Sequence, residues 1–403
     1  MGVIAVLLFL QAAANPGADG TKALDEGRYE AAAQAFTQAI AVDPADYTAH
    51  FNLALAYSLL HRDAEGIAEY RKTLELKPGL YQAQLNAAIL LLQQKSPADA
   101  LPLLQAALAQ KPAEFRPRFY LAEAQLATGA FAPAEHSYRA ALELDARSAP
   151  AQLGLAHALA QQGKLADAAP YFRRAAELDP NYRDALLELA ALYEENKQPA
   201  DAIEIYRQFP DDPAAAERLG LLLLDSREYA DAVPRLEAAY AQSPTPANRA
   251  ALAAAYVFNQ QGAKALPLLD KAVADDPANS ALRLMYARAL RDLRQFPAAA
   301  RQFSEAAKLK PGDAQTWNDL GSALYMADDY PQALAAFDRA RDLGLGNAGN
   351  WFLRAIILDK MHQPKPALEA YQQFLALSQG KNPDQEFQAR QRVKLLQREA
   401  GKR

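Results

Sequence analysis

Residues 314–347 have the sequence AQTWNDLGSALYMADDYPQALAAFDRARDLGLGN, which shows most clearly the pattern that predicts the fold. Its apolar and small residues follow the 3.6-residue spacing of two successive helices. They are Trp317, Leu320, Gly321 and Leu324 in the first helix, and Ala333, Phe337 and Ala340 in the second. Small side chains let two helix backbones approach closely, and large ones fill the remaining space. The stretch is therefore predicted to be a helical hairpin.

The pattern of the second helix recurs along the chain about every 34 residues. A small residue is followed by an aromatic residue or leucine four positions on, a small residue three later and a proline five after that. The recurrences are Ala32-Phe36-Ala39-Pro44, Gly66-Tyr70-Thr73-Pro78, Ala100-Leu104-Ala107-Pro112, Ala168-Phe172-Ala175-Pro180, Ala232-Leu236-Ala239-Pro244, Ala265-Leu269-Ala272-Pro277 and Ala299-Phe303-Ala306-Pro311. Because a fixed period indicates stacked units rather than one central core, the sequence predicts an all-α solenoid.

This pattern resembles the tetratricopeptide repeat (TPR), which places an aromatic residue at position 4, Gly or Ala at position 8, Ala at position 20 and an aromatic residue at position 24. Residues 314–347 match it almost throughout. The resemblance covers about nine-tenths of the chain and implies a right-handed superhelical solenoid of antiparallel helix pairs. It predicts eleven repeats that begin near residues 13, 47, 81, 115, 149, 183, 213, 246, 280, 314 and 348. Glycine marks the turn inside three of them, as Gly27, Gly129 and Gly163.

Two irregular repeats set the expected domain organisation. Repeat 1 has Pro16 and two glycines where its first helix begins, so that helix is expected to be short. Repeat 6 ends early, since Pro210 and Pro213 interrupt its second half. We therefore expect a signal peptide in residues 1–14, TPR repeats 1–6 in residues 15–210, repeats 7–11 in residues 211–379, and a C-terminal capping helix and tail in residues 380–403.

The capping helix is predicted from Asp384 to about Glu399. Basic residues late in this segment suit the negative end of a helix dipole. Phe387, Val393 and Leu396 are expected to face inward. A terminal element with one polar face keeps the end of a solenoid soluble.

The first fourteen residues have a different character from the repeats. Residues 3–10 are an unbroken apolar run, and Ala12-Ala13-Ala14 follows. This order is typical of a secretory signal peptide cleaved after Ala14, and the run is shorter than the roughly 20 residues that span a bilayer. No Lys or Arg precedes the run, so an apolar first helix of a cytoplasmic protein stays open as the alternative. We expect a periplasmic or secreted protein that contacts a membrane only through this segment.

Composition narrows the function. The net charge of −5 argues against nucleic acid as a partner, and the lack of cysteine excludes disulfides and thiolate chemistry. The five histidines fall in five different repeats without ligand spacing and are interpreted as surface or groove residues. Residues 344–349 match G-x-G-x-x-G but lie between two predicted helices, which favours a helix end and a turn. We find no catalytic residues and expect no metal, cofactor or small-molecule substrate.

In TPR proteins, the first helix of each repeat lines the concave face. Carried over to this chain, the resemblance implies a groove rich in aromatic residues near repeat 4 and in acidic residues farther on. The expected groove residues are Phe51, Asn52, Leu55, Leu85, Asn86, Arg116, Phe119, Tyr120, Glu188 and Glu194, with Glu123 beside them. Exposed aromatic residues often anchor a bound chain, and asparagines hydrogen-bond its backbone.

The function predicted from these features is a non-enzymatic scaffold that binds a protein or extended peptide in the groove, as an envelope or periplasmic assembly factor. The alternative is a cytoplasmic TPR regulatory subunit of a larger complex. An enzyme is disfavoured because no non-repeat stretch is long enough for a catalytic domain.

The signal-peptide interpretation predicts the N-terminus of the mature protein. We expect the exported chain to begin at or near Asn15, because signal peptidases cleave after small residues such as Ala14. N-terminal sequencing of envelope fractions measures this directly, and exported material that still begins at Met1 would contradict it.

Overall fold

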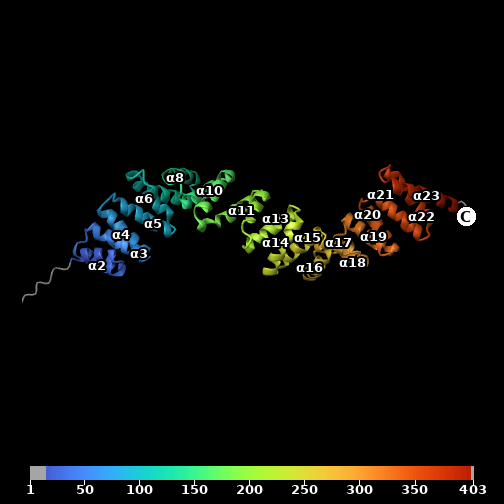
Figure 1. Ribbon diagram of the computed structural model, residues 1–403, viewed down its shortest axis with the longest axis horizontal. Helices are drawn as coiled ribbons and strands as arrows, with labels where there is room; N and C mark the ends of the chain where they lie inside the picture. The colour runs from blue at the N-terminus through green and yellow to red at the C-terminus, as the bar shows by residue number, and fades with distance from the viewer. Residues whose placement is uncertain (1–14, 401–403) are drawn as a thin grey trace, which may run out of the picture. The chain divides into compact units, whose positions relative to one another are not determined.

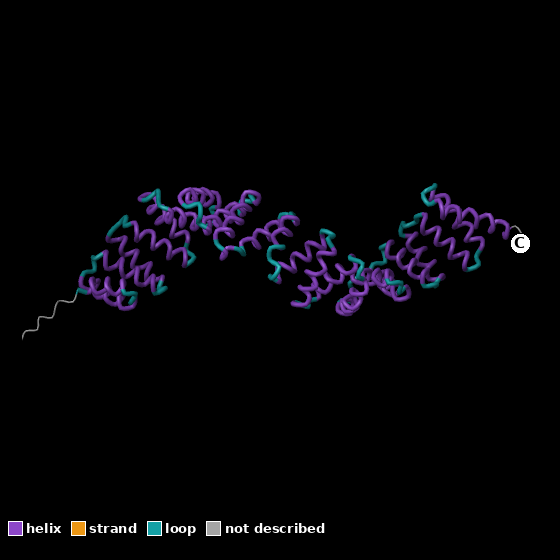
Figure 2. Tube along the Cα trace, in the orientation of Figure 1, coloured by secondary structure: helices purple, strands orange, loops and turns teal. Residues whose placement is uncertain are grey.

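The computed structural model describes residues 15–400, which form 23 α-helices joined by short turns, with no β-strand among them (Figures 1 and 2). Within residues 15–198 and within residues 199–400, helices that follow one another in the sequence pack against each other, as the hairpin prediction requires. The all-α solenoid is therefore confirmed. The predicted signal peptide lies outside the described residues.

Each repeat contributes two helices. The first helices are α1 (Pro16–Asp25), α3 (Tyr47–Leu59), α5 (Tyr81–Gln93), α7 (Phe115–Ala127), α9 (Ala149–Ala160), α11 (Ala185–Glu195), α13 (Pro213–Asp225), α15 (Pro246–Phe258), α17 (Ser280–Asp292), α19 (Ala314–Met326) and α21 (Ala348–Lys360). The second helices are α2 (Tyr29–Val42), α4 (Asp63–Leu76), α6 (Pro97–Gln110), α8 (Phe131–Leu144), α10 (Leu165–Leu178), α12 (Pro199–Tyr206), α14 (Tyr229–Gln242), α16 (Gly262–Asp275), α18 (Phe296–Leu309), α20 (Tyr330–Asp342) and α22 (Pro364–Ser378). A short 3₁₀ helix (Pro180–Tyr182) precedes α11, and α23 (Pro383–Ala400) ends the described chain.

Both irregular repeats have the expected local structure. Helix α1 has 10 residues against 13 in α3, and Asn15 caps its N-terminus by accepting a hydrogen bond from the Ala18 amide at 3.3 Å. Helix α12 has only 8 residues. Asp212 then caps α13 by accepting from the Ala215 amide at 2.7 Å.

The helices divide into two compact bodies, Met1–Gln198 and Pro199–Arg403, called here the N-terminal and C-terminal bodies. This division falls between the two helices of repeat 6. The boundary expected at residue 210 rests on repeat length and lies at the end of the same repeat.

The repeat core consists of the small and large residues that the sequence pattern singled out. In repeat 3, Ala100, Leu104 and Ala107 are fully buried. In repeat 10, a Cβ added to Gly321 would lie 2.9 Å from ring carbons of Phe337, closer than side-chain carbons approach. The small residue of the first helix therefore determines how closely the second helix can pack.

A left-handed backbone residue joins the two helices in all eleven repeats. Three of these residues are the glycines expected from the sequence, and the other eight are not glycine. The eight are His61, Lys95, Lys197, Arg227, Gln260, Arg294, Asp328 and His362, with φ between 57° and 64°. Positive φ is unfavourable for residues with a Cβ, so the fold imposes this turn.

Helix α23 caps the last repeat, but the prediction that Phe387 faces inward was wrong. Leu396 is buried and Val393 is half-buried, whereas Phe387 is 64% exposed. Ala389 packs in the core together with Val393 and Leu396, because positions 389, 393 and 396 lie on one face of a helix. Phe387 lies two positions before Ala389, on the outward side of the helix.

The turn geometry predicts how two substitutions at equivalent positions affect stability. Lys95→Gly should raise the free energy of unfolding by about 0.5–1 kcal/mol, because the left-handed penalty exceeds the added freedom of the unfolded chain. Gly129→Ala should lower it by about 1 kcal/mol, since open space surrounds the new Cβ and only the backbone is affected. Urea unfolding measures both. Shifts of the same sign would show that the backbone at this position is not the determinant.

Candidate functional site

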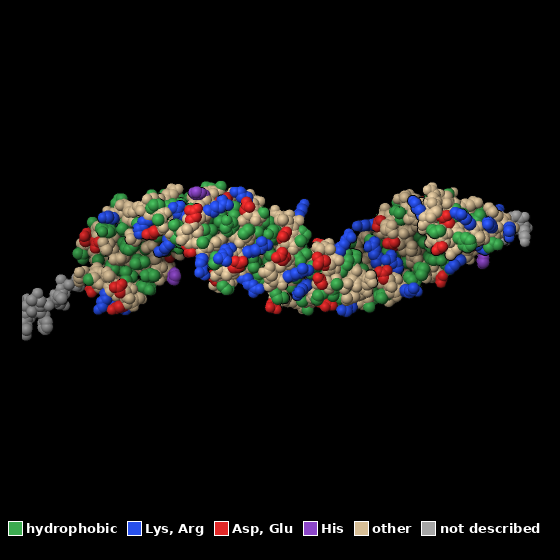
Figure 3. All heavy atoms as spheres, turned by 45° about the horizontal axis from the view of Figure 1, so that its top comes forward, with side chains coloured by type: hydrophobic (Ala, Val, Ile, Leu, Met, Phe, Trp, Pro, Cys, Tyr) green, Lys and Arg blue, Asp and Glu red, His purple; other side chains and the backbone are tan. Residues whose placement is uncertain are grey.

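The ten predicted groove residues all lie on first helices of the N-terminal body, namely α3, α5, α7 and α11. First helices of successive repeats contact each other: α5 contacts α7, and α7 contacts α9. First helices therefore form the more tightly packed, inner side of this body. Hydrophobic side chains are numerous on the surface of the N-terminal body (Figure 3).

The exposure of these residues differs from the expectation in one case. Arg116 and Glu188 are exposed, and most of the others are half-buried, as a binding surface requires. Leu85 is only 3% exposed and belongs to the core around α5 and α6, so its assignment to the groove was wrong.

An aromatic row lies along α7. Phe115 and Phe119 are one helical turn apart, and their rings stack with centroids 5.5 Å apart. The Phe119 ring also meets Tyr120 edge-on at 5.2 Å and Tyr138 of α8 at 6.2 Å. Such edge-to-face contacts hold the rings in fixed orientations. The half-buried Phe119 is thus a rigid apolar surface.

Phe51 on α3 extends the apolar surface toward the N-terminus. Its ring packs edge-on against Tyr70 at 5.7 Å. Phe51 and Tyr120 both pack against the core cluster that lies between them, around α4 to α6. The structure therefore brings the aromatic residues of repeats 2 and 4 to the two sides of repeat 3.

The two predicted asparagines differ in their hydrogen bonding. The Asn86 amide donates a hydrogen bond to the hydroxyl of Tyr70 at 3.2 Å, so one of its donors is used within the fold. The side-chain carbonyl oxygen of Asn86 accepts no hydrogen bond from another described residue, so it can accept one from a bound chain. Asn52 is half-buried and forms no side-chain hydrogen bond with another described residue.

A carboxylate lies next to the aromatic row. Glu123 is one turn beyond Phe119 on α7 and accepts a hydrogen bond from the hydroxyl of the fully buried Tyr138. Burial raises the pKa of Glu123, although the Tyr138 hydrogen bond and the charge of His157 act in the opposite direction. This carboxylate is therefore poorly solvated on the inner side of the body.

His157 on α9 is a second polar residue on the first helices, after Glu123 on α7. Its Nε2 lies 2.8 Å from a carboxylate oxygen of Glu188 on α11, and its ring packs edge-on against Phe172 at 5.4 Å. From the sequence alone, His157 was interpreted as a surface or groove residue without a partner. His157 occupies the same position in repeat 5 as Glu123 does in repeat 4. This shared position could have linked the two residues from the sequence alone.

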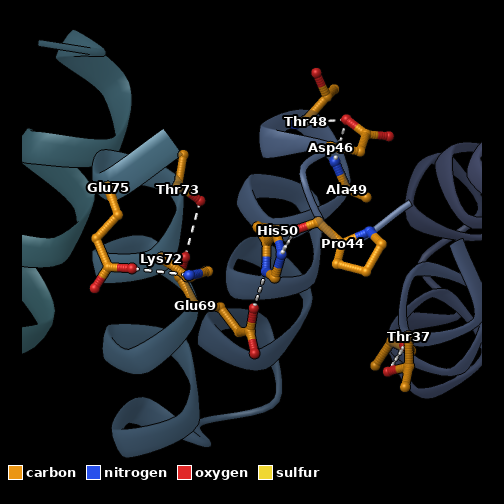
Figure 4. A network of polar contacts seen from close by, with 11 residues as sticks. Thr37, Pro44, Asp46, Thr48, Ala49, His50, Glu69, Lys72, Thr73 and Glu75 are labelled. Carbon is orange, nitrogen blue, oxygen red and sulfur yellow. Dashed lines mark hydrogen bonds and ion pairs between the residues drawn. The ribbon is translucent and has the colours of Figure 1, made fainter. Parts of the chain in front are cut away.

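The other histidine with a defined environment is structural. His50 is 6% exposed, with Nδ1 2.5 Å from Glu69 and Nε2 3.2 Å from the carbonyl oxygen of Pro44 (Figure 4). Its interpretation as a surface or groove residue was wrong. Arg118, Gln152, Arg283 and Trp317 occupy the same repeat position and donate to the carbonyl six residues earlier in the same way. This position holds the linker between repeats.

The glycine-rich stretch of residues 344–349 is a helix end followed by a turn. Gly344 has φ of +94° and follows α20, and Asn347 caps α21, so the glycine-rich stretch is the expected helix end and turn. Within residues 15–400, no group of three His, Asp or Glu side chains is arranged to hold a metal ion.

Comparison with protein families identifies the fold. A family model described as tetratricopeptide repeat matches residues 18–81, 153–216, 217–280 and 284–348, and a second model with the same description matches residues 91–138. The first model alone matches more than half of the chain. The chain belongs to the tetratricopeptide repeat family. Membership of the TPR family supports a role as a scaffold for protein–protein interactions.

Individual relatives share shorter parts of the TPR chain. Hsp70-Hsp90 organizing protein of Triticum aestivum is 40% identical over 60 residues, which are 15% of this chain and 10% of that protein. This chain thus spans about a tenth of the length of that curated relative. A solved MamA structure, MSR-1 C2, is 25% identical over 41% of this chain and 95% of its own, with a TM-score of 0.39. MamA from Desulfovibrio magneticus RS-1 is 22% identical over 40% of this chain and 92% of its own, with a TM-score of 0.38.

None of the TPR helices within the described residues combines the length and the apolar character needed to cross a membrane.

The environment of Glu123 predicts a pH-dependent effect on stability. A raised pKa means that deprotonation opposes folding, so the contribution of Glu123 to stability falls as the pH rises above its unfolded pKa. Glu123→Gln keeps an acceptor for Tyr138 without the charge. We expect it to be more stable than wild type at pH 7, with the difference shrinking toward pH 4.

Urea unfolding at both pH values measures this difference. The matched control is Glu143→Gln, an exposed glutamate of α8, which should leave stability unchanged at either pH. A loss of stability in Glu123→Gln at pH 7 would show instead that Tyr138 and His157 hold the charged carboxylate favourably.

Proposed function

We propose that this TPR protein is a non-enzymatic scaffold that holds an extended segment of a partner protein along the first helices of its N-terminal body. The observation that carries this proposal is the half-buried aromatic row on α7, in which Phe119 lies between Phe115 and Tyr120. Rigid aromatic rings offer a large apolar area at low entropic cost, which makes them effective anchors.

The partner segment would lay apolar side chains against Phe51, Phe119 and Tyr120. Asn52 would hydrogen-bond its backbone, and the free carbonyl of Asn86 would accept from it. Acidic residues follow farther along the same helices, with Glu188 exposed on α11. They would speed the approach of a basic segment, an effect that salt weakens.

We place this scaffold in the periplasm or outside the cell, as an envelope assembly factor. The support is the apolar run of residues 3–10 with Ala12-Ala13-Ala14 after it. The second candidate is a cytoplasmic regulatory subunit, in which the apolar run of residues 3–10 would be part of the fold. Cell fractionation distinguishes the two without reference to the binding site.

The binding site is tested with the double variant Phe51→Ala, Phe119→Ala. The native partner is first captured from envelope extract with the wild-type chain and identified by mass spectrometry, and its affinity is then measured by calorimetry. Each large side chain contributes roughly 1.5–3 kcal/mol when buried. Loss of two anchors should therefore weaken binding by well over tenfold.

The control variant is Phe258→Ala on α15. Phe258 is half-exposed and stacks on Tyr229 in the C-terminal body, so this change removes a similar ring outside the proposed site. It should leave the affinity unchanged. Equal affinity of the double variant and the wild type, with the fold intact by circular dichroism, would assign partner binding to another surface.

A further inference from the structure

One face of α23 is firmly attached to the last repeat. Ala389 and Leu396 are buried in a cluster with Phe352 and Phe374. Arg392 donates two hydrogen bonds to the carboxylate of Asp359 on α21, one of them at 2.7 Å. The helix therefore presents its opposite face in a fixed orientation.

The opposite face combines apolar and basic side chains. Phe387, Gln391, Lys394 and Arg398 follow each other at intervals of four, three and four residues, which places them on one side of a helix. All four are exposed, and so is Leu395 beside Lys394. Phe387 is 64% exposed and Leu395 is 46% exposed. We call these five residues the α23 stripe.

The basic side chains in and beside the α23 stripe differ in whether they pair with a described residue. Arg390, at the edge of the stripe, pairs with Glu386 at 2.7 Å. Lys394 and Arg398 form no ion pair with any of the described residues. Their charges are therefore available to an external group. Asp384, in the first turn of the helix, is the acidic residue at the other end of this face.

The C-terminal segment differs in charge from the rest of the chain. Residues 380–403 contain seven Lys and Arg against three Asp and Glu, a net charge of +4, whereas the whole chain has a net charge of −5. Basic and hydrophobic side chains lie side by side near the C-terminal end (Figure 3). Such an asymmetry indicates a local attraction for an anionic surface.

We propose that the α23 stripe binds the surface of an anionic lipid bilayer. Phe387 and Leu395 would enter the interface between headgroups and acyl chains, and Lys394 and Arg398 would contact lipid phosphates. Basic helices with exposed Phe and Leu are typical of this mode of binding. The site is separate from the proposed partner site, which lies on the first helices of the N-terminal body.

The same features indicate the strength of the contact. Two apolar side chains and two unpaired cations give reversible, peripheral binding rather than stable insertion. Because part of the attraction is electrostatic and exposed to solvent, binding should weaken as the salt concentration rises.

The test is co-sedimentation of the full chain with vesicles of phosphatidylcholine, with or without about one third phosphatidylglycerol. Residues 1–14 carry no charged side chain, so the difference between the two kinds of vesicle reports on the rest of the chain. We expect sedimentation with anionic vesicles in low salt that is at least tenfold weaker for Phe387→Ala. The pair Lys394→Gln, Arg398→Gln should lose the dependence on anionic lipid.

Matched controls are Val42→Ala, which removes an apolar side chain that is 80% exposed on α2, and Lys308→Gln on α18. Both should bind like the wild type. A second readout is the variant Phe387→Trp, whose added fluorescence should shift to the blue with anionic vesicles only. Thermal unfolding checks that each variant is folded.

Three outcomes would overturn the proposal. One is the absence of preference for anionic vesicles in low salt, and another is equal binding by the variants of the stripe and the controls. The third is a Phe387→Trp spectrum that does not shift with vesicles but responds to polyglutamate. That result would assign the α23 stripe to an acidic protein partner.

Discussion

Close contact between a small residue on the first helix of a repeat and a large residue on the second sets how near the two helices can pack. Cβ atoms added to Gly20, Gly220 and Gly321 would lie 2.8–2.9 Å from Phe36, Leu236 and Phe337. A larger residue at any of these points would separate the two helices. The contact fixes each hairpin, and each hairpin presents the surface on which the next one packs.

The same kind of contact between repeats determines the chemistry of the inner surface. A Cβ added to Gly154 on α9 would overlap the ring of Tyr138 from the preceding repeat. Because Gly154 has no side chain, the Tyr138 ring can pass it and its hydroxyl can reach Glu123. The hydrogen bond that holds the poorly solvated carboxylate beside the aromatic row thus depends on how repeats 4 and 5 stack.

The two candidate surfaces use different physical chemistry because they lie at different places in the array. First helices inside the N-terminal body have neighbours on both sides, so their aromatic residues are half-buried and rigid. Among the described residues, helix α23 packs with one face against the last repeat, and Phe387 and Lys394 are exposed together on its other face. The small and large residues that define each repeat are similar throughout the array. Function depends on the other residues, which do not take part in packing the helices together.

The sequence alone determined the repeat period, the helical hairpins, the short α1 and α12, and the existence of a terminal helix, because these depend on local periodicity and on proline. It also assigned the aromatic residues of the proposed site to the first helices of repeats 2 and 4, where the structure has them. Tertiary structure decided which neighbouring helix covers each face. It buried Leu85 and His50, left Phe387 exposed, and imposed left-handed turns on residues such as Lys95. It also paired His157 with Glu188, 31 residues apart in sequence, because stacking places α9 beside α11. Periodicity gives the spacing of residues along one helix, but contacts between helices depend on the rotation and distance that packing sets.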